Sequence, residues 1–524
     1  MSSPPESQFQ WTKSPRGRIW IRDLDECERF YRAVIRNGSG CYPVTACASF
    51  VITFGSGGDF SGAINHEKEV EKALRKAWIM LRYDHPTLGS RVKYDEEGKA
   101  NGRLKRVYEA FANSEEEQDW VENTFKAIDV EYGDMDGLNW FNEHAVSCFE
   151  VPTVFLLKSK DKKRNVDQIT AATVFLRCPH DITDGVGVLQ LLDQLFKYAA
   201  EAFEEGEKYS LPEWGNEHER LSPCLRVAAG IPDRVSDSLS KRFQEIQINN
   251  GSMYSHPALL GLPPSSSASS QTSPKMQRLS TCVSRPLSEK VLRACRAIAP
   301  GVSVTHVFMA ALASVLAELQ PQKEEPYPAR YVNHSMVNLR PYCREPYNSP
   351  GHADAAYHTI SAQALGIDVT VPSSLENPGD INNLSDIAVK VRDFYNSVRP
   401  VSSSEEPHEQ ILLAPFTFKG FTPPAGSDPH AVSNPPFCPV ALSSIGNIAS
   451  LVTRKHGPFE LTNVWAASEP LGAGVALFLD SWDGQIQLSG VFDTKYHNGQ
   501  CVEKFLNRIL NRVYEGLGIL ERCR

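Results

Sequence analysis

The sequence lacks the features that mark secreted, membrane-spanning or nucleic-acid-binding proteins. It contains no run of about 18 apolar residues, so we predict no transmembrane helix. The N-terminal MSSPPESQFQWTKSPRGRIW has no apolar segment behind a basic patch, and the C-terminal LERCR has no lipidation signal, so we expect neither a signal peptide nor a lipid anchor. No dense basic run accompanies the net charge of -9, which argues against nucleic acid as a partner.

Several catalytic and redox signatures are also missing. The 12 cysteines include no C-x-x-C pair, a pattern that favours reduced thiols and a cytoplasmic location over a disulfide framework. No G-x-S-x-G elbow is present, so no serine hydrolase nucleophile is predicted. The glycine-rich segment Gly55–Gly62 (GSGGDFSG) fits neither the dinucleotide nor the P-loop pattern, and we interpret it as a flexible loop.

What is present is the composition of an ordinary globular protein with more than one domain. The chain has 524 residues, 41% of them hydrophobic and 22% charged, and this length suggests about two to four domains. Residues 251–275 end in the Pro/Ser-rich LPPSSSASSQTSPK, which is too polar to bury a core. We therefore predict an exposed crossover linker between an N-terminal domain, 16–250, and a C-terminal domain, 276–524.

Helical and strand-like patterns alternate in both halves, which predicts an α/β fold. We predict helices in five segments, of which Ser303–Glu318 is apolar on most faces and is therefore expected to be buried. These segments are Glu67–Tyr83, Val186–Phe203, Glu289–Ala299 (with Ser288 as its cap), Ser303–Glu318 and Gln500–Gly516. Tyr331–Leu339 reads as one strand, and Gly474–Leu479 and Gln485–Val491 form a predicted hairpin around Asp480–Gly484.

The most informative stretch is Cys178–Gly185, CPHDITDG, an H-x-x-x-D-G motif between two patterned segments. The segment before it, Ile169–Leu176, is apolar and β-prone, and Val186–Phe203 after it is helical. A strand thus delivers His180 to a tight turn, and a helix leaves from it. This arrangement holds one imidazole rigidly at the edge of a cleft.

Histidine at such a position is suited to general base catalysis, because its ordinary pKa lies close to neutral. Asp184 either orients the imidazole or pins the turn through a salt bridge elsewhere. Gly185 permits unusual backbone torsions and leaves room for a substrate. The alternative interpretation is structural: His180 simply ends a strand and Asp184 caps the next helix.

Two further groups are candidates for the same site. Arg340 follows Asn338 at a predicted strand end, where it could pair bidentately with Asp184; otherwise it is a surface arginine. Ser443 and Ser444, beside Gly446, could donate hydrogen bonds to a developing oxyanion, although an ordinary Ser/Gly turn explains them equally simply.

The other reactive side chains give weaker indications of a functional site. His352, Asp354 and His358 could be imagined as metal ligands, but no strand or helix pattern fixes them together, so we predict no metal site. Cys178 lies on the same short turn as His180, and poor alignment between the two favours a packing role for its thiol.

Taken together, HDITDG after a strand, SVTHVFMAALASVLA, VNLRP, SSIGN and LDSWDG resemble the CoA-dependent acyltransferase superfamily. This group includes plant BAHD acyltransferases, peptide-synthetase condensation domains and fungal O-acetyltransferases, and the likeness is greatest to trichothecene 15-O-acetyltransferase-type enzymes. The resemblance extends from DHPTL, at 84–88, to the final helix. It implies two chloramphenicol-acetyltransferase-like domains with a central channel between them.

The resemblance also implies roles for the residues. His180 would be the base, Asp184 structural, Gly185 a residue that keeps the channel open, and Arg340 the partner of Asp184. Acetyl-CoA or another acyl-CoA would be a co-substrate rather than a bound cofactor, and the acceptor a small-molecule alcohol from fungal secondary metabolism. We expect a monomer that works through a ternary complex, without a covalent acyl-enzyme.

The sequence departs from two relatives within that group. Condensation domains carry two adjacent histidines, whereas Pro179 occupies the first of these positions here. Plant members carry D-F-G-W-G, which is absent, and Asp480–Trp482 lies in a different hairpin. An enzyme that uses a carrier-protein thioester or forms an amide, and a non-catalytic binding protein, are the alternatives.

Overall fold

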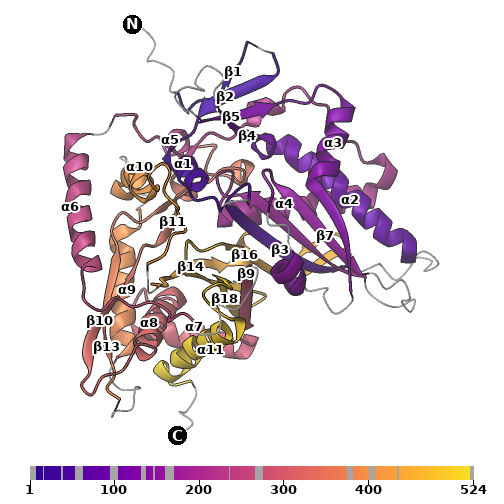
Figure 1. Ribbon diagram of the computed structural model, residues 1–524. Coiled ribbons are helices and arrows are strands. Elements are labelled where there is room, and N and C mark those ends of the chain that lie inside the picture. The colour runs from indigo at the N-terminus through magenta and orange to yellow at the C-terminus, as the bar shows by residue number, and fades with distance from the viewer. Residues whose placement is uncertain are drawn as a thin grey trace.

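The computed structural model describes most of the chain and arranges it in two lobes (Figure 1). The described residues are 8–15, 17–36, 39–52, 63–94, 104–131, 137–144, 148–159, 170–234, 236–265, 275–374, 382–400, 408–433 and 436–519. The predicted loop Gly55–Gly62 lies outside these residues, as does the 266–274 part of the predicted linker.

The first lobe is built on a six-stranded sheet of order β15-β16-β3-β8-β7-β6. Its strands are β3 (Pro43–Ile52), β6 (Phe125–Val130), β7 (Thr153–Ser159), β8 (Thr170–Pro179), β15 (Lys455–His456) and β16 (Phe459–Ser468). All neighbours are antiparallel except β6 and β7. Helices α2 (Ala63–Asp84) and α4 (Gly185–Glu205) pack against it through an apolar core that includes Leu74, Trp78 and Phe196.

A small antiparallel sheet and a short helix sit at the edge of this lobe. The sheet has the order β1-β2-β5-β4. Its elements and the neighbouring helices are β1 (Thr12–Lys13), β2 (Ile19–Asp23), α1 (Glu26–Ala33), β4 (Arg91–Tyr94), β5 (Leu104–Glu109) and α3 (Ser114–Thr124). Asp25 caps α1 in a capping box with Glu28, which fixes where the helix begins.

The second lobe contains a four-stranded sheet of order β14-β17-β18-β9 and two strand pairs, β10 with β13 and β11 with β12. Its strands are β9 (Met276–Cys282), β10 (Tyr327–Asn333), β11 (Met336–Asn338), β12 (His358–Ile360), β13 (Leu365–Val371), β14 (Val440–Asn447), β17 (Val475–Trp482) and β18 (Gln485–Asp493). Two helices precede this half of the sequence, α5 (Leu225–Ala228) and α6 (Asp237–Tyr254). The helices within it are α7 (Arg285–Ile298), α8 (Val304–Glu318), α9 (Leu384–Val398), α10 (Glu409–Phe421) and α11 (Gly499–Gly516).

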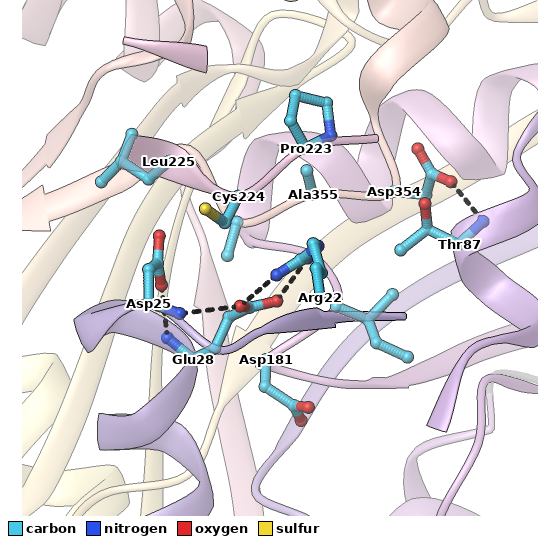
Figure 2. A pocket seen from close by; sticks show the side chains of 12 residues that line it. Arg22, Asp25, Glu28, Thr87, Asp181, Pro223, Cys224, Leu225, Asp354 and Ala355 are labelled. Carbon is cyan, nitrogen blue, oxygen red and sulfur yellow. Dashed lines mark hydrogen bonds and ion pairs between the residues drawn. The ribbon is translucent and has the colours of Figure 1, made fainter. Parts of the chain in front are cut away.

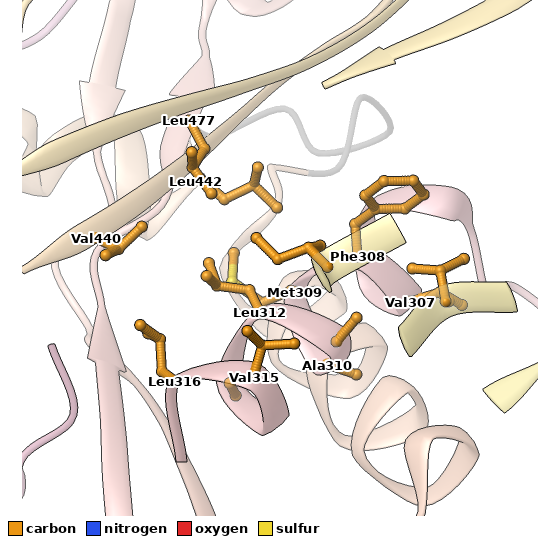
Figure 3. Packing of buried hydrophobic residues seen from close by; sticks show 14 of the residues in the cluster. Val307, Phe308, Met309, Ala310, Leu312, Val315, Leu316, Val440, Leu442 and Leu477 are labelled. Carbon is orange, nitrogen blue, oxygen red and sulfur yellow. The ribbon is translucent and has the colours of Figure 1, made fainter. Parts of the chain in front are cut away.

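Helix α8 forms the centre of the second core (Figure 3). Its small and apolar residues are buried on nearly every face, from His306 to Ala317. Met309 and Leu312 point toward Val440, Leu442 and Leu477 of the sheet. A helix that is apolar all round is buried in this way because it has no polar face to offer water.

Strand β16 crosses from the second half of the sequence into the first sheet. It pairs with β3 from Phe459 opposite Ile52 to Ser468 opposite Val44. The neighbouring strand β17 then returns to the sheet of the second lobe. The lobes therefore share the chain between 455 and 468, and the division of the sequence at 251–275 stays a prediction.

Two local expectations are wrong. Helix α7 begins at Arg285 with Ser284 before it, so Ser288 lies inside the helix, where its hydroxyl donates to the Val283 carbonyl and accepts from the Ile486 amide. The predicted strand Tyr331–Leu339 is broken into β10 and β11. The two pieces pair with different partners, β13 and β12, which one continuous strand could not reach.

Candidate active site

The H-x-x-x-D-G motif lies at the junction of the lobes. Strand β8 ends at Pro179, and the His180 amide then donates to the Tyr42 carbonyl at 2.8 Å, continuing the pairing of β8 with β3. The chain turns, and α4 begins at Gly185. The local structure is the strand, turn and helix predicted from the sequence.

A cavity of about 500 Å³ opens beside the motif, a size typical of pockets that bury drug-sized ligands. Its walls come from both lobes, because α1, β3, α4 and β16 of the first meet β10 to β12, β14 and β17 of the second. Of the seven residues predicted to form or support the site, all but Arg340 line it. These residues are His180, Asp184, Gly185, Asn338, Ser443 and Ser444.

The His180 ring is held by aromatic neighbours. It stacks on Tyr31 with a centroid distance of 4.0 Å and an interplanar angle of 5°, and the His358 ring lies 5.4 Å away. Within the described part of the chain, Nδ1 of His180 has no hydrogen-bond partner. Burial, and secondarily His358, lowers the pKa of His180 to about 3. The imidazole is therefore neutral, with a lone pair available, throughout the physiological pH range.

Asp184 directs its carboxylate at the turn and at Arg340. Its Oδ1 accepts from the amides of Val186 and Gly187, and its Oδ2 accepts from the Tyr357 amide at 2.8 Å and from Arg340 Nη2 at 3.1 Å. Burial opposes ionisation of this group, but Arg340 and the amides outweigh it and hold its pKa well below the usual range. The carboxylate thus caps α4 and anchors it to the second lobe.

Arg340 is buried behind the cavity and joins several segments. Besides Asp184, it donates through Nη1 to the His352 carbonyl at 2.8 Å and through Nη2 to the Ala355 carbonyl at 2.9 Å. Asn338 Oδ1 accepts from the Arg340 amide and so closes the turn after β11. The structure therefore brings Arg340 and Asp184 together through one hydrogen bond and not through the bidentate pair that was predicted, because Nη1 and part of Nη2 bind carbonyls of the 352–357 segment.

Two of the residues weighed as metal ligands share a partner, and the third lies apart from them. His352 Nδ1 lies 2.9 Å from the Ser222 hydroxyl, and the Asp354 carboxylate accepts from that hydroxyl and from the Thr87 amide. The His358 ring lies near that of His180 instead. Among the residues that the structure describes, no three His, Cys, Asp or Glu side chains converge as a metal site.

Ser443 and Ser444 lie on β14, on the wall of the cavity formed by the second lobe. The Ser444 hydroxyl lies 2.8 Å from the Thr305 hydroxyl at the start of α8. Cys178 is fully buried in the core of the first lobe, and burial raises the pKa of its thiol well above the usual value. A thiol of this kind packs and does not ionise.

The curated proteins that match the sequence are acetyltransferases. No family model matches the sequence. The chain is 23% identical to the acetyltransferase pigO of Monascus ruber over 97% of its own length and 98% of that protein. It is 22% identical to the O-acetyltransferase pigM of the same organism, over 96% of its length and 86% of that protein.

A solved structure gives the same fold. The TRI3 trichothecene 15-O-acetyltransferase from Fusarium sporotrichioides matches with a TM-score of 0.76 and 14% identity, over 97% of this chain and 98% of that one. In sequence the chain is similar to acetyltransferases, and in fold it is similar to one of them, as its resemblance to the CoA-dependent acyltransferase superfamily predicts. The fold is therefore the pair of chloramphenicol-acetyltransferase-like lobes that the motifs indicated, and the enzyme is an acyltransferase.

Buried ion pairs support the H-x-x-x-D-G motif, and Figure 2 shows the part of this ion chain that joins Arg22 to Glu28. Arg106 Nη2 donates to the carboxylate of Asp181, the residue after His180, at 2.6 Å, and its Nε donates to Glu28 at 2.7 Å. Arg22 binds the other side of Glu28 at 2.6 Å. Burial opposes the charge on Glu28, yet the two arginines lower its pKa to about 2. The chain therefore ties the motif to α1, which carries Tyr31 one turn after Glu28.

Sequence reasoning missed Tyr31 as a site residue, and it considered His358 only as a metal ligand, a role that it rejected. The Tyr31 hydroxyl lies 2.7 Å from His358 Nε2, and His358 Nδ1 lies 3.8 Å from Asp184 Oδ2. Tyr31 and His358 are 327 residues apart in the sequence. The local sequences CERFY, at 27–31, and AYHT, at 356–359, carry no signal of this contact, because it forms only when the lobes meet. None of the helices in the described ranges is long and apolar enough to span a bilayer.

Proposed function

We propose that this enzyme transfers an acyl group, most simply acetyl, from acyl-CoA to a hydroxyl of a secondary metabolite, with His180 as the general base. The metabolite would be a terpenoid or polyketide, as the trichothecene 15-O-acetyltransferase relationship suggests. The observation that carries the proposal is the position of His180. Its neutral imidazole lies at the wall of a cavity between the lobes, stacked on Tyr31.

The reaction follows from that position. His180 takes the proton of the acceptor hydroxyl as the oxygen attacks the thioester carbonyl, forming the new carbon–oxygen bond. The tetrahedral oxyanion then collapses, the carbon–sulfur bond breaks, and the imidazolium returns its proton to the departing thiolate. Ser443 and Ser444 are candidates for donors to the oxyanion, since their strand lines the same cavity.

The remaining proposed parts of the function concern the acyl donor and the setting. Acetyl-CoA acts as a co-substrate and not as a resident cofactor. All cysteines within the described residues are free thiols, most of them buried, which supports a reducing compartment such as the cytoplasm. We further propose that the enzyme acts as a monomer, because both walls of the cavity come from one chain.

The first experiment is a calorimetric titration with acetyl-CoA, longer acyl-CoAs and free phosphopantetheine, followed by a screen of alcohols for thiol release. Saturable one-to-one binding of an acyl-CoA supports the proposal. Absence of binding to every CoA species would shift the assignment to a carrier-protein thioester or a binding protein.

His180→Ala should lower the rate of acyl transfer by about 10²- to 10⁴-fold while acyl-CoA still binds. Undiminished turnover in that variant would overturn the role of His180.

The pH dependence gives a second measurement. Because burial depresses the pKa of His180 to about 3, the base form is present at every pH above that value. We expect no loss of kcat from protonation of His180 between pH 8 and pH 5. An acid limb near pH 6.5 that His180→Gln removes would contradict this assignment.

A further inference from the structure

One mouth of the cavity carries large apolar side chains that are exposed to solvent. Tyr254, Met336 and Phe421 all line the cavity and are 46%, 49% and 40% exposed. They come from the ends of α6, β11 and α10, three elements far apart in the sequence. Clustered apolar exposure of this kind at the rim of a pocket marks a surface that a ligand covers.

His334 joins the aromatic side chains into a row. Its ring stacks on Tyr254 at 6.1 Å with an interplanar angle of 17°, and meets Phe421 edge-on at 4.9 Å. Its Nδ1–H donates to the Ser361 carbonyl at 2.9 Å. Burial lowers the pKa of His334, so the ring stays neutral and keeps Nε2 as a hydrogen-bond acceptor.

The cavity offers no free charge for an ionic ligand. Among the described residues that line it, none is lysine or arginine. Its two carboxylates are already paired, Asp184 with Arg340 at 3.1 Å and Glu469 with Arg36 at 3.2 Å. Burying a charged group without a partner is costly, so this lining selects against an anionic ligand and gives a cationic one no advantage.

A polar group next to the aromatic row has an unused hydrogen-bond donor. Asn333, at the end of β10, lines the cavity and is 5% exposed. In the described part of the chain its Nδ2 donates to no acceptor. An amide that is buried without a partner costs free energy, which a ligand oxygen beside it would recover.

The row also has a defined separation from the base. Met336 and Asn338 face the same side of β11 and lie about 7 Å apart along it. Asn338 pairs with His358, whose ring lies 5.4 Å from that of His180. Because paired strands lie a further 5 Å or so apart, a ligand that touches both the row and His180 must extend well beyond a single ring.

We propose that Tyr254, His334, Met336 and Phe421 form the acceptor subsite, and that it takes a neutral, flat, polycyclic alcohol with a carbonyl or ether oxygen facing Asn333. The rings of such a ligand stack in the row, and its hydroxyl reaches His180. This inference rests on the proposed function for the identity of the reacting hydroxyl. The subsite itself is defined by binding.

The test uses two probes that share a naphthylmethanol frame and differ by one carboxylate group: 2-naphthalenemethanol, which is neutral, and 6-(hydroxymethyl)-2-naphthoate, which is an anion. Calorimetric titration of the full chain should give at least about tenfold tighter binding of the neutral probe. Phe421→Ala should weaken that binding about 5- to 20-fold, because stacking and apolar contact are both lost. Ile248→Ala is the control: Ile248 is 73% exposed on α6 and does not line the cavity, so binding should change by less than twofold.

A gain of function completes the test. Met336→Lys supplies the missing cation and should reverse the preference toward the naphthoate, even if Phe421→Ala were to fold poorly. Equal binding of the two probes, no binding of either, or an unchanged preference in Met336→Lys would overturn the subsite. So would weaker acetyl-CoA binding in Phe421→Ala, because the row would then belong to the acyl donor.

These outcomes are separable from those that bear on the proposed function. If the neutral probe binds as expected but no acyl-CoA binds, the subsite stands and the proposed donor fails. If acetyl-CoA binds and His180→Ala abolishes transfer, yet the probes do not discriminate, the proposed function stands and the subsite fails.

Discussion

Alanine at Gly187 and alanine at Gly185 are the same chemical change two residues apart in α4, and we expect opposite results from them. A Cβ built on Gly187 would lie 2.4 Å from the Ala353 carbonyl oxygen, 2.4 Å from Thr183 Oγ1 and 2.9 Å from Arg340 Nη2. A Cβ on Gly185 would meet nothing within 4 Å. Gly185 also lines the cavity beside the base.

The distances set the size of each effect. Ordinary contact of a Cβ begins near 3.4 Å, and the Ala353 oxygen belongs to the backbone and cannot rotate away, so Gly187→Ala forces α4 and the 352–357 segment apart. Overpacking of this kind costs about 1–3 kcal/mol, against which the higher helix propensity of alanine returns at most about 1 kcal/mol. At roughly 2–4 °C per kcal/mol for a large domain, Tm should fall by several degrees.

Gly185→Ala should leave Tm unchanged or slightly higher, because the methyl group enters open space and alanine favours the helix. The same methyl group narrows the channel, and we expect kcat/KM to fall about tenfold, the usual value of one methyl group in a binding pocket. Thermal melts and steady-state thiol release on both variants make the comparison. The reasoning is refuted if Gly187→Ala melts like the parent, or if Gly185→Ala retains full kcat/KM.

Three further predictions concern buried charges. Asp184→Asn and Arg340→Met should each lower the free energy of unfolding by about 3–5 kcal/mol, because each leaves a buried charge without its partner. The double variant should lose less than the sum of the two, and additive losses in Tm would show that the pair is not coupled. Burial raises the pKa of Asp480 to about 7 although Arg278 lies nearby. Folding therefore favours the neutral acid, and the free energy of unfolding decreases as pH rises from about 4 to 7. Asp480→Asn should raise Tm at pH 8 and change it little at pH 4, and a lower Tm at pH 8 would contradict this. Arg106→Met breaks the ion chain behind the base, so water should reach the imidazole and move the acid limb of the rate to higher pH; a lower Tm with an unmoved profile would leave Arg106 a purely structural role.

The parts of the site that are local in sequence could be predicted. The apolar run before His180 and the helical spacing after it follow from side-chain periodicity, and α4 begins within one residue of the predicted helix. The turn between β17 and β18 was also readable, since Asp483 and Gly484 adopt the positive φ values that an Asp-Gly turn requires. The pairing of Arg340 with Asp184 could also be predicted, because the turn that holds Arg340 is short and its charge is opposite to that of Asp184.

The contacts between lobes could not be predicted. Tyr31 and His358 show no periodic relation to His180, and only the fold brings them within stacking and hydrogen-bond distance. The ion chain through Arg106 could not be predicted either, because its members lie on β2, α1, β5 and the motif. A charged residue at a strand position is ordinarily predicted to be on the surface. Contacts between residues far apart in one sequence can be identified only from the three-dimensional structure.

The passage of β16 into the sheet of the first lobe limits how this protein can be divided. A cut within 251–275 would strip β16 from β3 and leave a ten-residue edge with open amides and carbonyls, a ready template for aggregation. Separately expressed halves should therefore be insoluble, whereas coexpressed halves have an edge through which to reassemble. The same holds for chimaeras made from related enzymes. The two lobes are not interchangeable modules, and an N-terminal half can be exchanged only together with the 455–468 segment that completes its sheet.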